Sequence, residues 1–159
     1  MSRAFNLLFA ICTFMAFGLA RADVQITEVM ADPSGSEFRN EYIELTNLGN
    51  SPVNLDRWSI SDEVTTDLLV FASKSVLAPG QRCLILDPDY EAGDQPYDAF
   101  PVETLIARVG DHTIGSAGLD NRFPERITLR DSEGEEKDTI VYDVGRAGHS
   151  FEARVLLDG

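Results

Sequence analysis

Residues 126–142 read RITLRDSEGEEKDTIVY, and this stretch decides the fold class. Apolar and polar side chains alternate in its first five residues, which places Ile127 and Leu129 on one face of an extended strand. Residues 131–134 have the composition of a tight turn, and a second extended run follows at residues 139–142. The pattern therefore predicts an antiparallel β-hairpin.

Similar strand-like runs occur along the rest of the chain, separated by turn sequences rich in Gly, Pro, Asn and Asp. They cover residues 24–30, 41–46, 57–61, 67–71 and 82–87. No segment after residue 22 keeps a period of 3.6 residues. Seven or more short strands with frequent turns predict an all-β fold, either a sandwich or a barrel.

The alternating apolar positions of these runs also predict the core. The set is Ile26, Ile43, Leu45, Trp58, Ile60, Leu84, Leu86, Ile127, Leu129 and Ile140. The long spacer at residues 88–119 holds either a hidden strand at residues 103–109 or an irregular surface excursion. Irregular excursions of this kind often carry ligand sites.

The first 22 residues are typical of a secretory signal peptide. Arg3 is the basic n-region, an apolar run covers residues 7–19, and Ala20-Arg21-Ala22 fits the cleavage pattern. An uncleaved membrane anchor is the alternative. We expect cleavage, a mature domain at residues 23–159 without a membrane span, and a secreted, periplasmic or cell-surface location.

Cleavage changes the charge and the cysteine content. The whole chain carries 13 basic and 27 acidic residues, a net charge of −14, and the mature domain carries −16 because two arginines and no acid leave. Such acidity argues against binding to nucleic acids. Only Cys83 remains, within an apolar run, so we expect a buried thiol and no internal disulfide.

Five blocks in the mature chain resemble the bacterial lamin-tail domain family, in the order that the family has them. The first comprises residues 26–33 and 40–47, the next three lie at residues 53–62, 77–80 and 115–119, and the last is the hairpin around Gly134. The resemblance implies an immunoglobulin-like β-sandwich, for which we expect about seven to nine strands. It implies export, and it supplies no catalytic residue. Family members usually continue beyond the segment that resembles residues 148–152. We therefore expect that the C-terminal end of the domain is truncated here and that the chain is a fragment of a longer protein.

Catalytic chemistry finds little support in the residues themselves. The two histidines, His112 and His149, have no nucleophile at a recognisable spacing, and no serine lies in a Gly-x-Ser-x-Gly elbow. No pair of cysteines or histidines has the spacing of a zinc site. We therefore predict that the protein is not an enzyme.

Carboxylates are the one abundant chemical resource. Asp87, Asp89, Glu91 and Asp94 superficially resemble a calcium loop, although the glycine comes one position too late for an EF-hand. A solvated acidic loop is the favoured interpretation, and calcium is the alternative, with no other cofactor expected.

A second acidic group consists of Glu28, Asp32, Glu41 and Glu44. Pairing of the first two strands would bring Glu28 and Glu44 together, and like charges repel unless a cation lies between them. A structural network with Arg39, Arg57 or Arg126 is the favoured interpretation, and a metal site is the alternative.

Three functional hypotheses follow from these observations. The first is a secreted, non-catalytic binding or scaffolding module that presents a rigid sandwich to a protein or a cell-envelope component. The second is an accessory domain of a larger exported hydrolase or nuclease, and the third is a calcium-dependent surface module. The sequence predicts neither the partner nor the oligomeric state.

Overall fold

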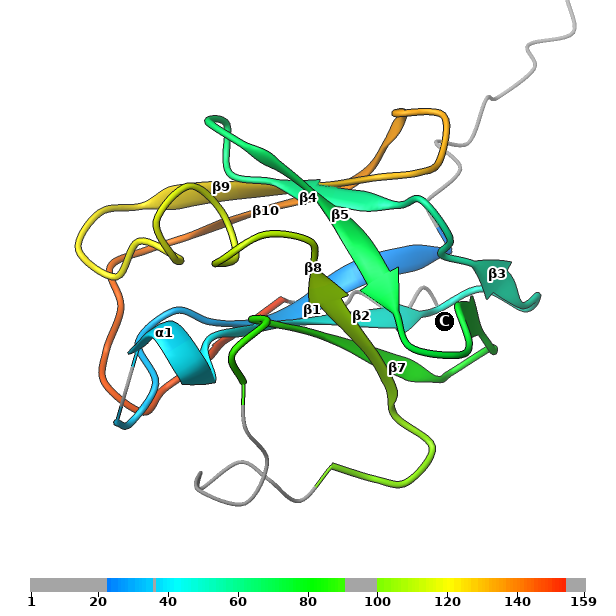
Figure 1. Cartoon of the computed structure of the whole chain (residues 1–159), viewed down its shortest axis with the longest axis horizontal. Helices are drawn as coiled ribbons and strands as arrows, with labels where there is room; N and C mark the ends of the chain where they lie inside the picture. Colours follow the sequence, from blue (N-terminus) through cyan, green and yellow to red (C-terminus); the bar gives the residue numbers. More distant parts are fainter. Residues whose placement is uncertain (1–22, 36, 91–99, 154–159) are drawn as a thin grey trace, which may run out of the picture.

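The structure is a computed structural model that describes residues 23–35, 37–90 and 100–153 (Figure 1). These residues form eleven strands and one helical turn, α1 (Glu37–Asn40). The strands are β1 (Val24–Met30), β2 (Tyr42–Asn47), β3 (Val53–Asn54), β4 (Ser59–Ser61), β5 (Thr66–Phe71), β6 (Val76–Leu77), β7 (Arg82–Leu86), β8 (Leu105–Val109), β9 (Glu125–Arg130), β10 (Glu136–Tyr142) and β11 (Phe151–Glu152). The predicted signal peptide lies outside the described residues. Among the described residues, no helix has the length and apolar character needed to span a bilayer.

The strands form two layers that face each other (Figure 1). Nine of them follow one continuous order, β10-β9-β4-β5-β8-β7-β2-β1-β11, and β3 pairs separately with β6. Strand β5 joins the layers, because Thr66 and Leu68 pair with β4 whereas Leu69 and Phe71 pair with β8. The fold is therefore an all-β, immunoglobulin-like sandwich, as predicted. It has slightly more strands than expected because β3, β6 and β11 are only two residues long.

The predicted hairpin is confirmed by the pairing of β9 with β10 around Gly134, which has a positive φ of 82°. The strand expected within residues 103–109 is also present, as β8. It runs parallel to β7, unlike the other strand pairs in the sheet order. This parallel pairing requires a long crossover, which explains the length of the segment between β7 and β8.

The main core lies between the two layers and consists of buried apolar side chains. Trp58 and Leu129 share it, as predicted, and Leu129 is fully buried. Cys83 also faces this core with no exposed surface, and burial raises the pKa of its thiol to about 12. An inert structural thiol is the result.

Leu84 and Leu86 are buried, but they do not lie in that core. They point to the outer face of β7, where they pack with Met30, Tyr42 and Tyr90 in a second cluster. The rings of Tyr90 and Phe100, with centroids 6.0 Å apart, belong to the segments that leave β7 and approach β8. Both leucines are therefore buried, as predicted, but in a separate cluster, because the chain covers both faces of β7 and alternation no longer separates inside from outside.

The two layers meet again at a seam between β1 and β10. The backbone N–H of Ile26 donates to the carboxylate of Asp138 at 2.8 Å instead of joining a ladder. Pairing registers also shift beside these residues, between Ile26 and Glu28 and between Glu136 and Asp138. The Asp138 carboxylate and the register shifts in β1 and β10 thus protect the edges of these two strands from pairing with a further strand.

Candidate binding site

The segment that joins β8 to β9 is the most unusual part of the molecule. Five carboxylates, four of them from distant parts of the chain, accept its backbone N–H groups, and we call them the carboxylate cradle. The pairs are Glu41 with Leu119 at 2.9 Å, Asp62 with Ser116 at 2.6 Å, Asp67 with Gly115 at 2.7 Å, Asp87 with Ile114 at 2.7 Å and Glu125 with Asp120 at 3.0 Å. This segment forms no ladder, so its buried donors need side-chain acceptors, and ionised acceptors give the strongest bonds.

Apolar anchors and glycines complete the fit of this segment. Ile114 is fully buried and Leu119 is only 4% exposed, so both insert into the main core. Gly115 has a φ of +73°, and a Cβ there would lie 2.9 Å from Asp62 Oδ2. Gly118 has a φ of +87°, and a Cβ there would lie 3.0 Å from Glu41 Oε2. Both positions require glycine, because the chain approaches the carboxylates closely in a left-handed conformation.

Burial perturbs several of the cradle carboxyls. Burial raises the pKa of Asp67, with the charges of Asp111 and Asp62 acting in the same direction. Burial likewise raises the pKa of Glu125, together with the charges of Asp62 and Asp120. The ionised forms of these groups are therefore less favourable here than in water.

Asp62 behaves differently. Burial acts to raise its pKa, but the backbone N–H groups of Thr65, Ser116 and Val64 outweigh burial and lower the pKa. Asp62 thus ties the turn after β4 to the β8–β9 segment as a stable carboxylate.

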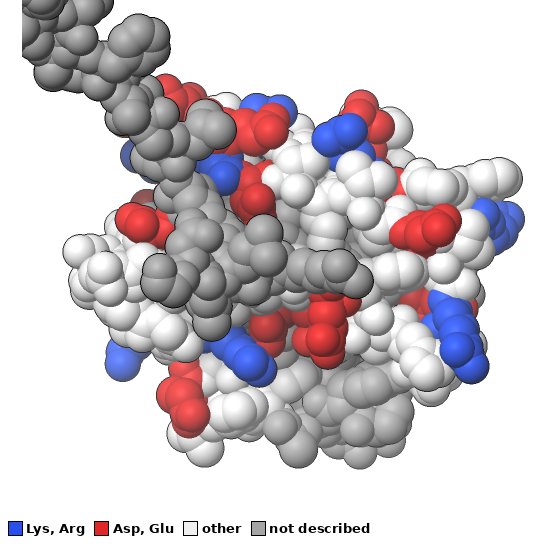
Figure 2. Space-filling model, turned by 180° about the vertical axis from the view of Figure 1, so that it is seen from behind, with Lys and Arg blue, Asp and Glu red and all other residues white. Residues whose placement is uncertain are grey.

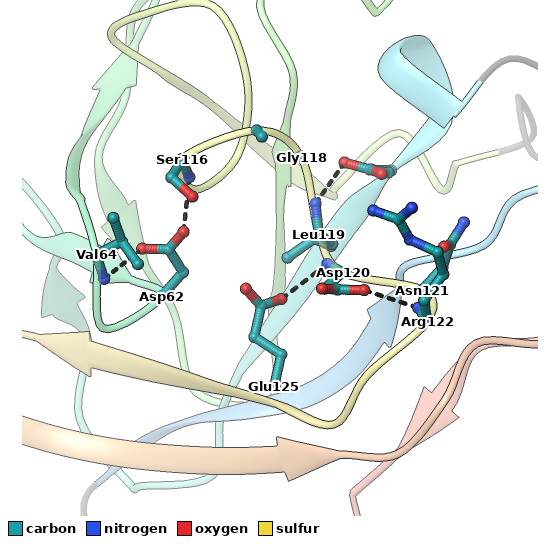
Figure 3. A pocket seen from close by; sticks show the side chains of 11 residues that line it. Asp62, Val64, Ser116, Gly118, Leu119, Asp120, Asn121, Arg122 and Glu125 are labelled. Carbon is teal, nitrogen blue, oxygen red and sulfur yellow. Dashed lines mark hydrogen bonds between the residues drawn. The ribbon is translucent and has the colours of Figure 1, made fainter.

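A hollow of about 530 Å³ opens beside the cradle, and we call it the acidic hollow (Figure 3). In the view of Figure 3, the carboxylates of Asp62 and Glu125 lie beneath the loop that carries Ser116 and Gly118. Glu41, Asp62, Asp120 and Glu125 line the hollow against a single basic residue, Arg122. Apart from Asn121, the other lining residues are small or apolar, and the exposed side chain of Val64 forms part of the lining.

The hollow offers carboxylates and apolar surface to a ligand. Neither His112 nor His149 lines the hollow, and both are exposed on loops. The cradle carboxylates are engaged with backbone N–H groups, which fixes their positions. An acidic hollow with an apolar rim suits an amphipathic cationic group, such as a lysine or arginine side chain.

A second hollow of about 550 Å³ has a different character. It lies between the β5–β6 turn and the approach to β8, and its lining includes Ala72, Lys74, Val102 and Glu103. The charges of Lys74 and Glu103 balance each other here, so the hollow has little preference for a charged ligand of either sign. It is a useful control for the acidic hollow.

The predicted calcium residues lie partly within the described chain. Glu91 and Asp94 lie outside the described residues. Asp89 is exposed, but Asp87 is fully buried and its Oδ1 accepts the N–H of Ile114. Burial raises the pKa of Asp87 to about 6, with the charges of Asp89 and Asp111 acting in the same direction. The interpretation of a solvated loop is therefore wrong for Asp87.

The acidic group on the first two strands divides between two environments. Glu28 and Glu44 are directly opposite each other, as predicted. The arginine beside Glu44 is Arg82, at 3.5 Å, and not one of the three that the sequence suggested. The hydroxyl of Tyr42 donates a hydrogen bond to Glu28 at 2.7 Å. Burial and this hydrogen bond raise the pKa of Tyr42. Of the predicted acid–arginine network, the described residues contain one ion pair, between Glu44 and Arg82, and Arg126 pairs instead with Glu63.

Glu41, which directly precedes β2, belongs instead to the carboxylate cradle. On the face seen in Figure 2, basic side chains lie singly among the acidic ones. The basic side chains therefore form no positively charged patch on the part of that face that the structure describes.

Sequence reasoning missed Asp62, Asp67 and Glu125 as cradle residues. A usable signal was nevertheless present, since Asp62 and Asp87 directly follow strands and Glu41 directly precedes one. Acids at strand ends reach the loops at that end of a sandwich, and five such acids against few basic residues need backbone donors.

The model of the Lamin Tail Domain family matches residues 19–143, which include the whole cradle and the acidic hollow. The chain belongs to this family. Lamin tail domains are a non-catalytic, immunoglobulin-like fold family, in agreement with the sandwich described above. The short strand β11 of this lamin tail domain lies beyond the matched region. No curated protein matches the chain.

Proposed function

We propose that this lamin tail domain is a secreted, non-catalytic binding or scaffolding module whose partner is a protein or a cell-envelope component. The acidic hollow carries the proposal, because it combines four carboxylates with an open apolar rim. Val64 in its lining is 78% exposed, and Phe123, next to the lining residue Arg122, is 66% exposed. Exposed apolar side chains beside unbalanced charge are typical of interaction sites.

The expected partner surface follows from the same features. A basic side chain with an apolar stem would place its stem against Val64 and its charge among the carboxylates. The cradle holds the loop in position before binding, so little ordering would be needed on association. Export of the domain is supported by the signal-like first 22 residues.

The decisive experiment compares two matched variants in a pull-down from the exported fraction. Ala117→Arg places a bulky cation in the lining of the acidic hollow, at an exposed position. Ala72→Arg makes the same change in the second hollow, also at an exposed position. We expect the first variant to lose the captured partner and the second to retain it.

Two outcomes would contradict the proposal. One is equal capture by both variants. The other is hydrolysis by the purified protein that a single carboxylate substitution abolishes, since a binding module has no such activity.

A further inference from the structure

Asp87 contains the one carboxylate oxygen in the described residues that is buried and has no hydrogen-bond partner. Its Oδ1 is bonded to Ile114 N at 2.7 Å, but its Oδ2 is enclosed and unpartnered. The residue as a whole has no exposed surface. A buried ionised oxygen without a partner is strongly unfavourable, and such groups are usually paired or coordinate a metal.

The neighbouring charges oppose one another at Asp87 and leave its Oδ2 without a hydrogen-bond partner. The carboxylates of Asp89 and Asp111 both act on it with the same sign. Arg108 is near, but its guanidinium donates to the backbone carbonyls of Asp87, Pro88 and Tyr90 at 2.5, 3.0 and 3.0 Å. The Arg108 charge acts to lower the pKa of Asp87, but its N–H groups are directed to the main chain rather than to Asp87 Oδ2.

We propose that Asp87, Asp89 and Asp111 form a site for a divalent cation of the calcium type. Asp87 is the buried anchor at the end of β7, and Asp111 comes from the β8–β9 segment that the Ile114 N–H bond ties to Asp87. The ligand set differs from a linear calcium loop because it joins two segments of the chain. The site goes beyond the proposed partner-binding function and does not depend on it.

Oxygen-only donors select hard cations, and irregular loops favour Ca²⁺ over Mg²⁺. Ca²⁺ accepts flexible coordination, whereas Mg²⁺ demands near-octahedral geometry and retains its waters. Asp89 and Asp111 are both exposed, so a cation can enter from solvent and draw them toward Asp87. Such movement is necessary. Among the described residues, only Asp131, Glu133 and Glu135 already hold three ligand oxygens within 4.8 Å of one another.

The group of Asp131, Glu133 and Glu135 supplies the matched control. Its residues lie on the turn between β9 and β10, where Lys137 already contacts Asp131 at 2.7 Å. Thermal unfolding of the EDTA-treated chain should be followed in millimolar CaCl₂, in MgCl₂ and in NaCl of equal ionic strength. We expect CaCl₂ to raise the melting temperature by several degrees, and MgCl₂ to raise it less.

The variants separate the proposed site from general charge screening. Asp87→Asn keeps an acceptor for Ile114 N and removes the unpaired charge, so it should fold, melt higher without metal and lose the calcium response. Asp111→Asn should weaken calcium binding about tenfold or more by calorimetry, because ligand charge sets affinity. Asp131→Asn should retain the wild-type response.

Four results would overturn the site: no calcium response in the wild type, an equal response to Mg²⁺, a response that survives in Asp87→Asn, or one that is lost in Asp131→Asn.

Discussion

The carboxylate cradle and the acidic turn between β9 and β10 are built from the same residue types in different surroundings. In the turn, Asp131 accepts N–H groups from Glu133 and Glu135, two and four residues away. In the cradle, four of the five bonds join residues separated by 27 to 78 positions. The turn therefore organises itself locally, whereas the cradle fixes a segment to the rest of the fold.

Their electrostatics differ in the same way. The hydrogen bond from Lys137 lowers the pKa of Asp131 at the surface. In the cradle, burial raises the pKa of Asp67, Asp87 and Glu125. In these residues, the ionised form of a carboxyl group is favoured only where hydrogen-bond donors lower its pKa by more than burial raises it.

The largest expected effect comes from removing a cradle acceptor. Asp62→Ala leaves the N–H groups of Val64, Thr65 and Ser116 without their acceptor and should destabilise the fold by about 3 kcal/mol. Asp131→Ala, which removes the local acceptor of the exposed turn, should cost clearly less. Urea unfolding of both variants checks the order, and equal losses would break the distinction between the two regions.

Glycine substitutions sharpen the comparison at the next level. Gly115→Ala should cost about 2 kcal/mol, because it adds a close contact with Asp62 to the strain of a positive φ. Gly134→Ala has a φ of +82° but no atom within 4 Å of the new Cβ, so strain alone should cost about 1 kcal/mol. Thermal unfolding measures both, and the reverse order would show that the cradle does not confine the segment.

The pH dependence should carry the signature of the cradle. Asp87 has a folded pKa of about 6 against an ordinary value of 3.8, so the folded state binds its proton more tightly. In the presence of EDTA, stability should therefore rise by about 1 kcal/mol as the pH falls from about 7 to about 5. The lowered pKa of Asp62 acts oppositely, and its contribution is lost only in stronger acid.

Asp87→Asn provides the control for that profile. It should flatten the rise between about pH 7 and about pH 5, because the group responsible no longer titrates. An unchanged profile would assign the rise to other carboxyls.

The smallest effect is expected at the exposed turn. Lys137→Met removes the ion pairs with Asp131 and Glu135 and should change the melting temperature by no more than about 2 °C. Added salt should reduce even this difference, since surface pairs are screened. A large, salt-independent loss would place the turn among the structural anchors.

Sequence reasoning was most successful where structure is local. The hairpin of β9 and β10 and the burial of Trp58 and Leu129 follow from period and turn chemistry. The burial of Leu84 and Leu86 was also predicted, but alternation did not indicate that they pack in a separate cluster on the other face of β7.

The candidate site was harder to predict for a related reason. Asp87 was singled out, but its partner Ile114 is 27 residues away. Asp62 and Asp67 bond to residues 54 and 48 positions away, and no local pattern encodes such distances.

The central claim is that the cradle holds the β8–β9 segment through its backbone. Amide hydrogen exchange by NMR tests it most directly at Ile114, Gly115, Ser116, Leu119 and Asp120. We expect these five amides to be protected from exchange to a degree similar to those of β9. In Asp62→Ala, the amide of Ser116 should exchange faster while the other four stay protected. Fast exchange of all five amides in the wild type would contradict it.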